Sequence, residues 1–178
     1  QPLILELACG RGEYSLGLAR MYPDRNFIGV DVKGARIWQG ASIALKEGLN
    51  NVAFLRTRIE QLTNFIDQKE VDEIWITFPD PFLRNSKSNR RLTSPNFLKA
   101  YRQILKPGGI VHLKTDSPQL YDFSLEVFEA DGQVHILYQN YDIYSKPLDF
   151  PELEIKTHYE RLHLADERKI KYLRFQIN

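Results

Sequence analysis

Short apolar segments alternate with amphipathic helical patterns along the first two thirds of the chain, and this alternation constrains the fold more than any other feature. The segments favour β-branched and aromatic residues and end at polar or glycine-containing turns, as buried parallel strands do. The predicted strands are Leu3–Leu5, Asn26–Asp31, Val52–Leu55, Val71–Phe78 and Ile110–Leu113. The predicted helices are Tyr14–Met21, Ala35–Lys46, a segment through Leu62, Phe65 and Ile66, a segment that begins at Ser94-Pro95, and Pro118–Glu129.

The last third of the chain has a different pattern. Val134–Tyr141 and Lys171–Ile177 are typical of two long strands, and a polar segment from Tyr144 to Arg168 separates them. Five strand–helix units followed by two more strands predict an α/β fold with a doubly wound, seven-stranded, mostly parallel sheet. With 178 residues the chain is expected to form one domain, 1–178. Because it begins without Met inside a strand pattern, we expect an N-terminal segment to be absent.

Composition excludes several classes of protein. The chain is 43% hydrophobic and 12% aromatic, so it can bury a core and is not disordered. A single cysteine allows no internal disulfide and suits a reducing compartment, so we expect a cytoplasmic protein. No uncharged apolar run approaches the roughly 18 residues of a membrane helix, so no membrane partner is expected.

A glycine-containing turn follows the first predicted strand. Gly10 and Gly12 allow the backbone to turn sharply and to approach a ligand closely. Asp31 ends the second strand, where an acid in nucleotide-binding folds holds ribose hydroxyls. The dinucleotide pattern fails because Ser15 occupies its third glycine position, and the acid Glu6 suits a ligand with a cationic end, such as S-adenosylmethionine. A plain turn beside a surface aspartate is the alternative.

Two further carboxylates follow predicted strands. Asp80 lies between Pro79 and Pro81 after the fourth strand, and the prolines restrict its backbone. Asp116 follows the fifth strand, which puts it at the same edge of a parallel sheet. His158 has no partner at metal-ligand spacing, and no metal is expected.

Basic residues are concentrated in one segment. Residues 81–115 contain no acid, so the rest of a chain with net charge +1 carries the excess negative charge. This distribution indicates an anion-binding face of the kind that contacts phosphates, with a solvated loop as the alternative. The eight basic residues are Arg84, Lys87, Arg90, Arg91, Lys99, Arg102, Lys106 and Lys114.

From Glu6 to Phe175 the chain resembles the bacterial tRNA (guanine-N7-)-methyltransferases, which have the Rossmann-like class I S-adenosylmethionine-dependent fold. Phe-Pro-Asp-Pro followed by Arg-Arg-Leu is the specific part of the resemblance, because many methyltransferases share the first turn. The motifs that carry the resemblance are the turn from Glu6 to Gly12, Phe78-Pro79-Asp80-Pro81, Arg90-Arg91-Leu92, Pro107-Gly108-Gly109, Lys114-Thr115-Asp116 and Thr157-His158-Tyr159-Glu160.

The resemblance implies transfer of a methyl group from S-adenosylmethionine, which leaves S-adenosylhomocysteine, to guanine N7 in the tRNA variable loop (position 46 of tRNA). It implies that Asp80 is catalytic. Because the N1–H and N2–H₂ edge of guanine offers only donors, we expect Asp116 or Glu160, with Asp80, to hold that edge. With the turn, the cofactor positions are Glu6, Gly10, Gly12, Asp31, Arg58 and Asp80. With the basic segment, the substrate positions are Arg84, Lys87, Arg90, Arg91, Asp116, Thr157, His158, Tyr159 and Glu160.

Two departures from the family pattern leave alternatives open. Arg58 stands where the family has an acid or amide near the adenine, and Lys87 stands in place of a histidine. A class I methyltransferase with another substrate would share the first turn and Asp31 without needing the basic segment. A non-catalytic RNA-binding module with this fold is the other alternative, and Arg58 is the feature that favours it.

Overall fold

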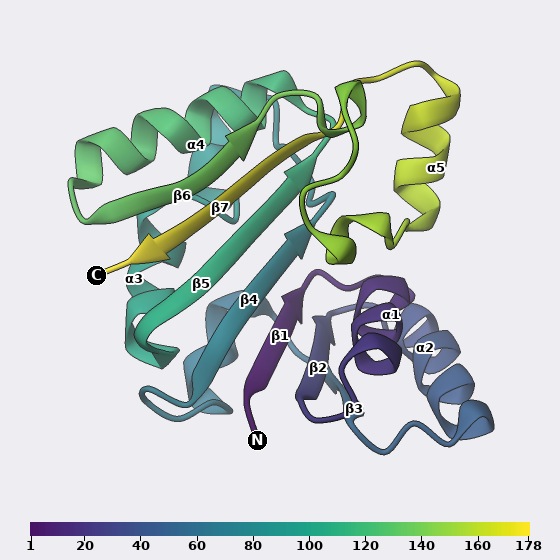
Figure 1. Ribbon diagram of the computed structural model, residues 1–178. Helices are drawn as coiled ribbons and strands as arrows, with labels where there is room; N and C mark the ends of the chain where they lie inside the picture. Colours follow the sequence, from purple (N-terminus) through teal and green to yellow (C-terminus); the bar gives the residue numbers. More distant parts are fainter.

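One seven-stranded sheet runs through the computed structural model, which describes residues 1–178 (Figure 1). The strand order is β3-β2-β1-β4-β5-β7-β6. β1 to β5 pair in parallel, whereas β7 is antiparallel to both β5 and β6, so the predicted doubly wound, mostly parallel sheet is confirmed. The strands are β1 (Leu3–Leu7), β2 (Asn26–Asp31), β3 (Val52–Arg56), β4 (Val71–Thr77), β5 (Leu105–Thr115), β6 (Val134–Asn140) and β7 (Lys171–Ile177).

Five α-helices and four short 3₁₀ helices connect the strands. The start of α3 follows the sequence signal, with Ser94 as the N-cap and Pro95 in the first turn, although the Ser94 hydroxyl donates to the Asn89 carbonyl (3.0 Å) instead of capping the helix. The α-helices are α1 (Glu13–Met21), α2 (Gly34–Glu47), α3 (Pro95–Ile104), α4 (Pro118–Asp131) and α5 (His158–Ala165). The 3₁₀ helices are η1 (Ile59–Asn64), η2 (Asn85–Arg90), η3 (Ile143–Ser145) and η4 (Pro151–Glu154).

The two faces of the sheet are covered by separate apolar cores. Successive side chains of a strand point to opposite faces, so Leu5 and Leu7 belong to one core and Ile4 to the other. The larger core has 22 buried residues and includes side chains of η1, α3 and α4. The smaller has 10 and is closed by α1 and by the segment between β6 and β7.

The register of the parallel strands brings their carboxyl ends to one edge of the sheet. Leu7 of β1 lies beside Val30 of β2 and Ile76 of β4, and Thr77 lies beside Lys114 of β5. The loops that follow these four strands therefore leave the sheet together. Asp80 and Asp116 lie in these loops, and Asp31 is the last residue of β2.

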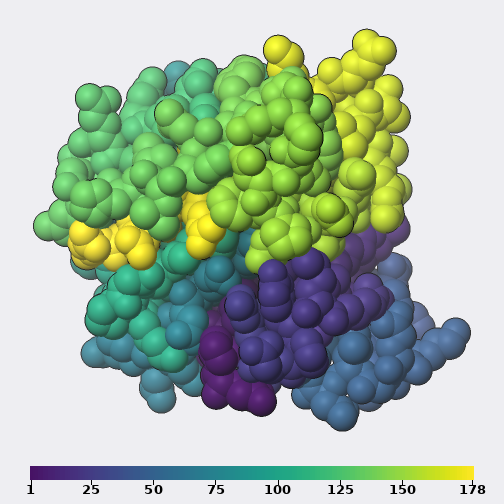
Figure 2. All heavy atoms as spheres, in the orientation of Figure 1, coloured from purple at the N-terminus to yellow at the C-terminus, as the bar shows by residue number.

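Residues 141–170, here called the excursion, connect β6 to β7 and pack on α1. In Figure 2 their green spheres lie directly against the purple spheres of the N-terminal part. The Tyr14 hydroxyl of α1 donates to the Glu152 carbonyl at 2.5 Å. A Cβ atom on Gly17 would lie 2.9 Å from Ile155, so the absence of a side chain on α1 lets the excursion approach closely.

Three predicted elements differ in the structure. The helix expected through Leu62, Phe65 and Ile66 is the six-residue 3₁₀ helix η1, which ends at Asn64. β5 begins at Leu105 instead of Ile110, with an irregular register opposite Val71 that accommodates the Pro-Gly-Gly sequence. The excursion, for which the sequence pattern predicted no helix, contains η3, η4 and α5.

Gly40 of α2 tests how closely this helix must approach the first loop. A Cβ atom there would lie 2.6 Å from the Arg11 carbonyl oxygen and 2.8 Å from the Phe54 ring. In Gly40→Ala we expect overpacking of about 1–3 kcal/mol to outweigh the gain of about 1 kcal/mol in helix propensity, so the free energy of unfolding falls. Urea unfolding measures it, with exposed Gln39→Ala as the control; an unchanged or higher midpoint for Gly40→Ala would contradict the packing.

Candidate active site

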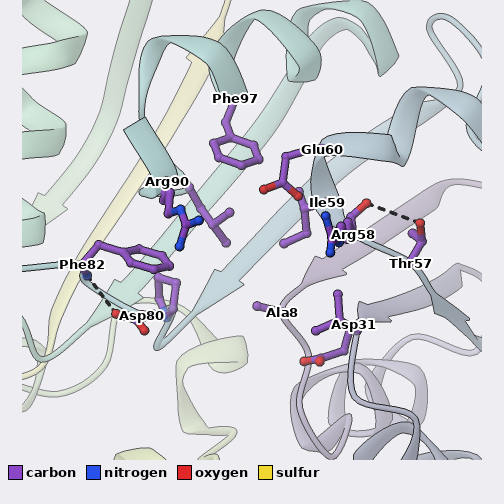
Figure 3. A pocket seen from close by; sticks show the side chains of 13 residues that line it. Ala8, Asp31, Thr57, Arg58, Ile59, Glu60, Asp80, Phe82, Arg90 and Phe97 are labelled. Carbon is purple, nitrogen blue, oxygen red and sulfur yellow. Dashed lines mark hydrogen bonds between the residues drawn. The ribbon is translucent and has the colours of Figure 1, made fainter. Parts of the chain in front are cut away.

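A cavity of about 400 Å³ opens at the carboxyl edge of the parallel strands (Figure 3). It brings together four of the residues identified from the sequence, namely Asp31, Arg58, Asp80 and Arg90. Figure 3 shows Asp31 and Asp80 on different sides of the cavity; Asp31 is the last residue of β2, and Asp80 lies in the loop after β4. Its apolar walls come from Ala8, Val32, Ile59, Phe82, Leu92 and Phe97. A mixed wall of this kind suits a ligand with a flat apolar part and polar edges.

The first loop is tied to Asp31 by hydrogen bonds. The Gly10 amide donates to Asp31 Oδ2 and the Lys33 amide donates to Asp31 Oδ1, both at 2.9 Å. Gly10 and Gly12 are in the left-handed region, and a Cβ atom on Gly12 would lie 2.4 Å from the Phe54 ring. Ala8 is also left-handed, with φ 57°, although it is not a glycine. These hydrogen bonds and the close approach to Phe54 restrict the conformation of the loop. The remaining lone pairs of Asp31 are free to accept hydrogen bonds from a ligand.

Glu6 lies behind this loop and does not line the cavity. Its carboxylate is 2% exposed and accepts from the Ser15 amide (2.8 Å), the Ser15 hydroxyl (2.5 Å) and the Thr77 hydroxyl (3.2 Å). Burial raises the pKa of Glu6 to about 7, although the hydrogen bonds from Ser15 and Thr77 oppose the rise. Glu6 thus fixes the start of α1, and its predicted contact with a cofactor stays a prediction.

Asp80 lies in a backbone segment of unusual conformation. Phe78 and Phe82 flank the Pro79-Asp80-Pro81 sequence. Their backbone φ values are 48° and 42°, which residues other than glycine rarely adopt. The Phe82 amide donates to Asp80 Oδ1 at 2.8 Å. Asp80 is otherwise exposed, and its second oxygen has no hydrogen bond within the protein. The carboxylate is therefore aimed by the backbone and available to a ligand.

The basic residues after Asp80 divide into two kinds. Arg84, Lys87 and Arg90 are exposed on or beside η2, and Arg90 also lines the cavity. Arg91 is only 3% exposed, and its guanidinium donates to the carbonyl oxygens of Pro81 and Phe82. The structure thus gives Arg91 a place inside the fold that differs from the expected contact with a phosphate.

The Thr157–Glu160 motif forms the N-cap and first turn of α5, and it contains two exposed and two buried residues. The exposed His158 and Tyr159 point outward, whereas Thr157 is buried and caps the helix by accepting from the Glu160 amide at 3.1 Å. Glu160 is fully buried: it pairs with Lys114 Nζ at 2.8 Å and accepts from the Tyr144 hydroxyl. Burial lowers the pKa of Lys114, and the Glu160 carboxylate opposes this. In this structure the Glu160 carboxylate anchors α5 to β5, and its predicted contact with guanine stays a prediction.

Asp116 is held by side chains from the end of the excursion. Arg168 Nη1 donates to its Oδ2 at 2.7 Å, and His163 Nε2 lies 3.3 Å from its Oδ1. The Asp116 side chain is 17% exposed, so a substrate could reach it only by sharing it with these partners.

Two residues of this region were missed by sequence reasoning. Glu60 lines the cavity, and in Figure 3 its carboxylate is directed into it, next to Arg58. Its position two residues after Arg58 was the available signal, since an acid there could replace the family's acid. Lys114 was identified as a positive charge and as part of the Lys114-Thr115-Asp116 motif, but not as a buried residue; a lysine inside a central strand must find a buried anion.

Two further observations concern the whole chain. None of its helices has both the length and the apolar character needed to span a bilayer. No group of three or more histidine, cysteine, aspartate and glutamate side chains is arranged to hold a metal ion.

The fold and this cavity define a class I S-adenosylmethionine-dependent methyltransferase. The sequence matches the family described as "Putative methyltransferase" over residues 1–173. The 16S rRNA methyltransferase KamB has the same fold, with a TM-score of 0.75 and 17% identity over 100% of this chain and 88% of that one.

Two relatives give the particular family. The tRNA (guanine-N(7)-)-methyltransferase of Christiangramia forsetii is 48% identical over 99% of this chain and 79% of its own length. That of Porphyromonas gingivalis is 49% identical over 98% of this chain and 70% of its own. The chain belongs to the bacterial tRNA (guanine-N7-)-methyltransferase family.

Glu6 makes the stability of the fold depend on pH. Its pKa of about 7 in the folded chain lies above the ordinary value of 4.5, so folding retains a proton that the unfolded chain loses. The free energy of unfolding therefore falls between pH 4.5 and 7, by an amount on the order of 3 kcal/mol, and this contribution is constant above pH 7. We expect Glu6→Gln to remove this fall in urea unfolding measured from pH 5 to 8. Exposed Glu129→Gln should keep it; parallel curves for Glu6→Gln and wild type would contradict the assignment.

The buried Lys114–Glu160 pair should be essential to the fold of the excursion. Glu160→Gln leaves the Lys114 ammonium buried without a counter-charge, which costs about 3–5 kcal/mol. We expect this loss in urea unfolding, whereas Glu154→Gln at an exposed site of η4 should change stability by less than about 0.5 kcal/mol. Replacing both partners, Lys114→Met with Glu160→Leu, should recover much of the loss. A Glu160→Gln variant as stable as Glu154→Gln would show that the pair does not anchor α5.

Proposed function

We propose that this protein methylates N7 of a guanine in the variable loop of tRNA, at position 46, with S-adenosylmethionine as the methyl donor. The observation that carries the proposal is the single cavity that contains both Asp31 and Asp80 and has exposed Arg90 on its rim. Membership of the family supports the same reaction. Residues 1–178 would act as one methyltransferase domain, and tRNA as the substrate places it in the cytoplasm.

The residues of the cavity fit the donor. Asp31 retains lone pairs for ribose hydroxyls, and there is no atom within 4 Å of the place where a Gly10 side chain would begin, so the backbone can approach a ligand. The apolar walls suit an adenine ring, whose amino group donates hydrogen bonds and whose ring nitrogens accept them. Glu60 can accept from the amino group and Arg58 can donate to a ring nitrogen, which would give Arg58 a role despite its departure from the family pattern. When bound, the donor supplies an electrophilic methyl group.

Guanine N7 carries an exposed lone pair, so the reaction needs no general base for the attack. The protein must instead hold the base in line with the methyl group and the departing sulfur. Asp80 is the available carboxylate at this point, since only the Phe82 amide occupies it. Its carboxylate oxygens would accept hydrogen bonds from the donor edge of guanine, and its negative charge would favour the cationic product. Asp116 is a second proposed contact, shared with Arg168 and His163.

The exposed basic residues Arg84, Lys87 and Arg90 would hold phosphates on either side of the target nucleotide, which must leave its stack to enter the cavity. The exposed His158 and Tyr159 at the start of α5 are proposed to contact the same nucleotide or its neighbour. Contacts to phosphates make binding weaken as the salt concentration rises.

The direct test is incubation with an unmodified tRNA transcript and methyl-labelled donor, followed by nucleoside analysis. We expect N7-methylguanosine with the normal transcript and none when the guanine at position 46 is replaced by adenine. Methylation of another nucleoside, or of a small molecule but not tRNA, would assign a different substrate. Binding of tRNA without binding of the donor in calorimetry would instead favour an RNA-binding module.

Asp80→Ala should lower kcat by about 10²–10³-fold, because a charge placed at the reacting base is lost. Asp80→Asn keeps the shape of the side chain and should be nearly as slow if the charge matters. Exposed Asp122→Ala on α4 is the control, with wild-type turnover expected. Single-turnover methyl transfer measures the effect, and an unchanged rate in Asp80→Ala would remove this carboxylate from the mechanism.

A further inference from the structure

Arg91 differs from its basic neighbours in where its charge lies. Its Nε donates to the Pro81 carbonyl (3.0 Å) and the Phe82 carbonyl (3.2 Å), and its Nη2 donates to the Phe82 carbonyl (2.9 Å). The guanidinium carbon lies 4.5 Å from the centre of the Phe123 ring of α4. Arg91 takes part in no ion pair. A buried cation with no anion costs free energy unless backbone carbonyls and an aromatic face replace its water.

The carbonyls that Arg91 binds belong to the residues that follow Asp80. Phe82 has a φ of 42°, a conformation that costs roughly 1–3 kcal/mol and persists only where its surroundings impose it. The Phe82 amide in turn donates to Asp80 Oδ1 at 2.8 Å. One residue thus carries both the carbonyl that Arg91 holds and the amide that holds Asp80.

We propose that Arg91 is a positioning residue: it clamps the Pro81-Phe82 backbone in its strained shape and so aims the Asp80 carboxylate, without contacting RNA. The inference rests on the proposed function, because Asp80 must act in methyl transfer for the clamp to affect catalysis. The proposal gives two adjacent arginines different functions: Arg91 is buried and positions the backbone, whereas Arg90 is exposed at the rim of the cavity.

Arg91→Lys is the central variant because it keeps the positive charge but not the fork of donors that spans two carbonyls. We expect kcat to fall by about 10-fold to 10²-fold, as for a small misplacement of a reacting group. The KM for tRNA and the slope of log Kd against log salt should stay at their wild-type values. Arg91→Ala should be slower still, and guanidinium added below denaturing concentration should restore part of its kcat.

Arg90→Ala provides the contrast. In this variant the slope of log Kd for tRNA against log salt should fall by about one, because an exposed phosphate contact is lost. The KM for tRNA should rise for the same reason. Lys46→Ala, at an exposed site on α2 outside the basic segment, is the control for a loss of charge alone. A wild-type kcat in Arg91→Lys, or a salt slope that falls in Arg91→Ala as it does in Arg90→Ala, would overturn the proposal.

Amide hydrogen exchange gives a readout that does not depend on activity. The Phe82 amide should exchange faster in Arg91→Lys than in wild type, while the amides of β4 keep their protection. Unchanged exchange at Phe82 would also overturn the clamp. A wild-type enzyme that fails to methylate tRNA would instead refute the proposed function, and the exchange measurement would still decide what Arg91 does.

Discussion

Parallel pairing of β1, β2, β4 and β5 determines where a ligand can bind. Because the four strands end at one edge, their loops bring Asp31, Asp80 and Asp116 to the same side of the sheet from positions far apart in the sequence. If one of these strands ran the other way, the loop that follows it would lie at the opposite edge of the sheet, and the cavity would lose the residues of that loop. The two antiparallel strands, β6 and β7, lie beyond β5 and leave this edge intact.

Three buried charged or titratable groups shape the loops at this edge without facing the cavity. Glu6 holds the start of α1 through Ser15, Arg91 holds the carbonyls that follow Asp80, and Lys114 pairs with Glu160 to hold α5. Each group is costly to bury, so each requires the loop to supply its hydrogen bonds. The loops are thereby held in conformations that their own sequences would not select, as the left-handed Ala8 and Phe82 show.

The sequence predicted the fold well because each strand and most helices carry their own periodic pattern, and the strand ends located the edge where Asp31 and Asp80 lie. It did not separate exposed from buried members of a motif. Arg90 and Arg91 are adjacent and chemically identical, yet only the tertiary packing of Phe123 and the Pro81-Phe82 carbonyls places one of them inside. The same holds for Glu160, whose partner Lys114 is remote in sequence.

The excursion begins and ends on adjacent antiparallel strands, where Asn140 of β6 lies opposite Tyr172 of β7. The excursion is therefore, in its topology, a long hairpin connection between β6 and β7. The entropy of closing such a loop depends only weakly on its length. Changes in the length of this segment should leave strand pairing undisturbed, provided that its side chains in the smaller core, a counter-charge for Lys114 and the small residue Gly17 opposite Ile155 are kept.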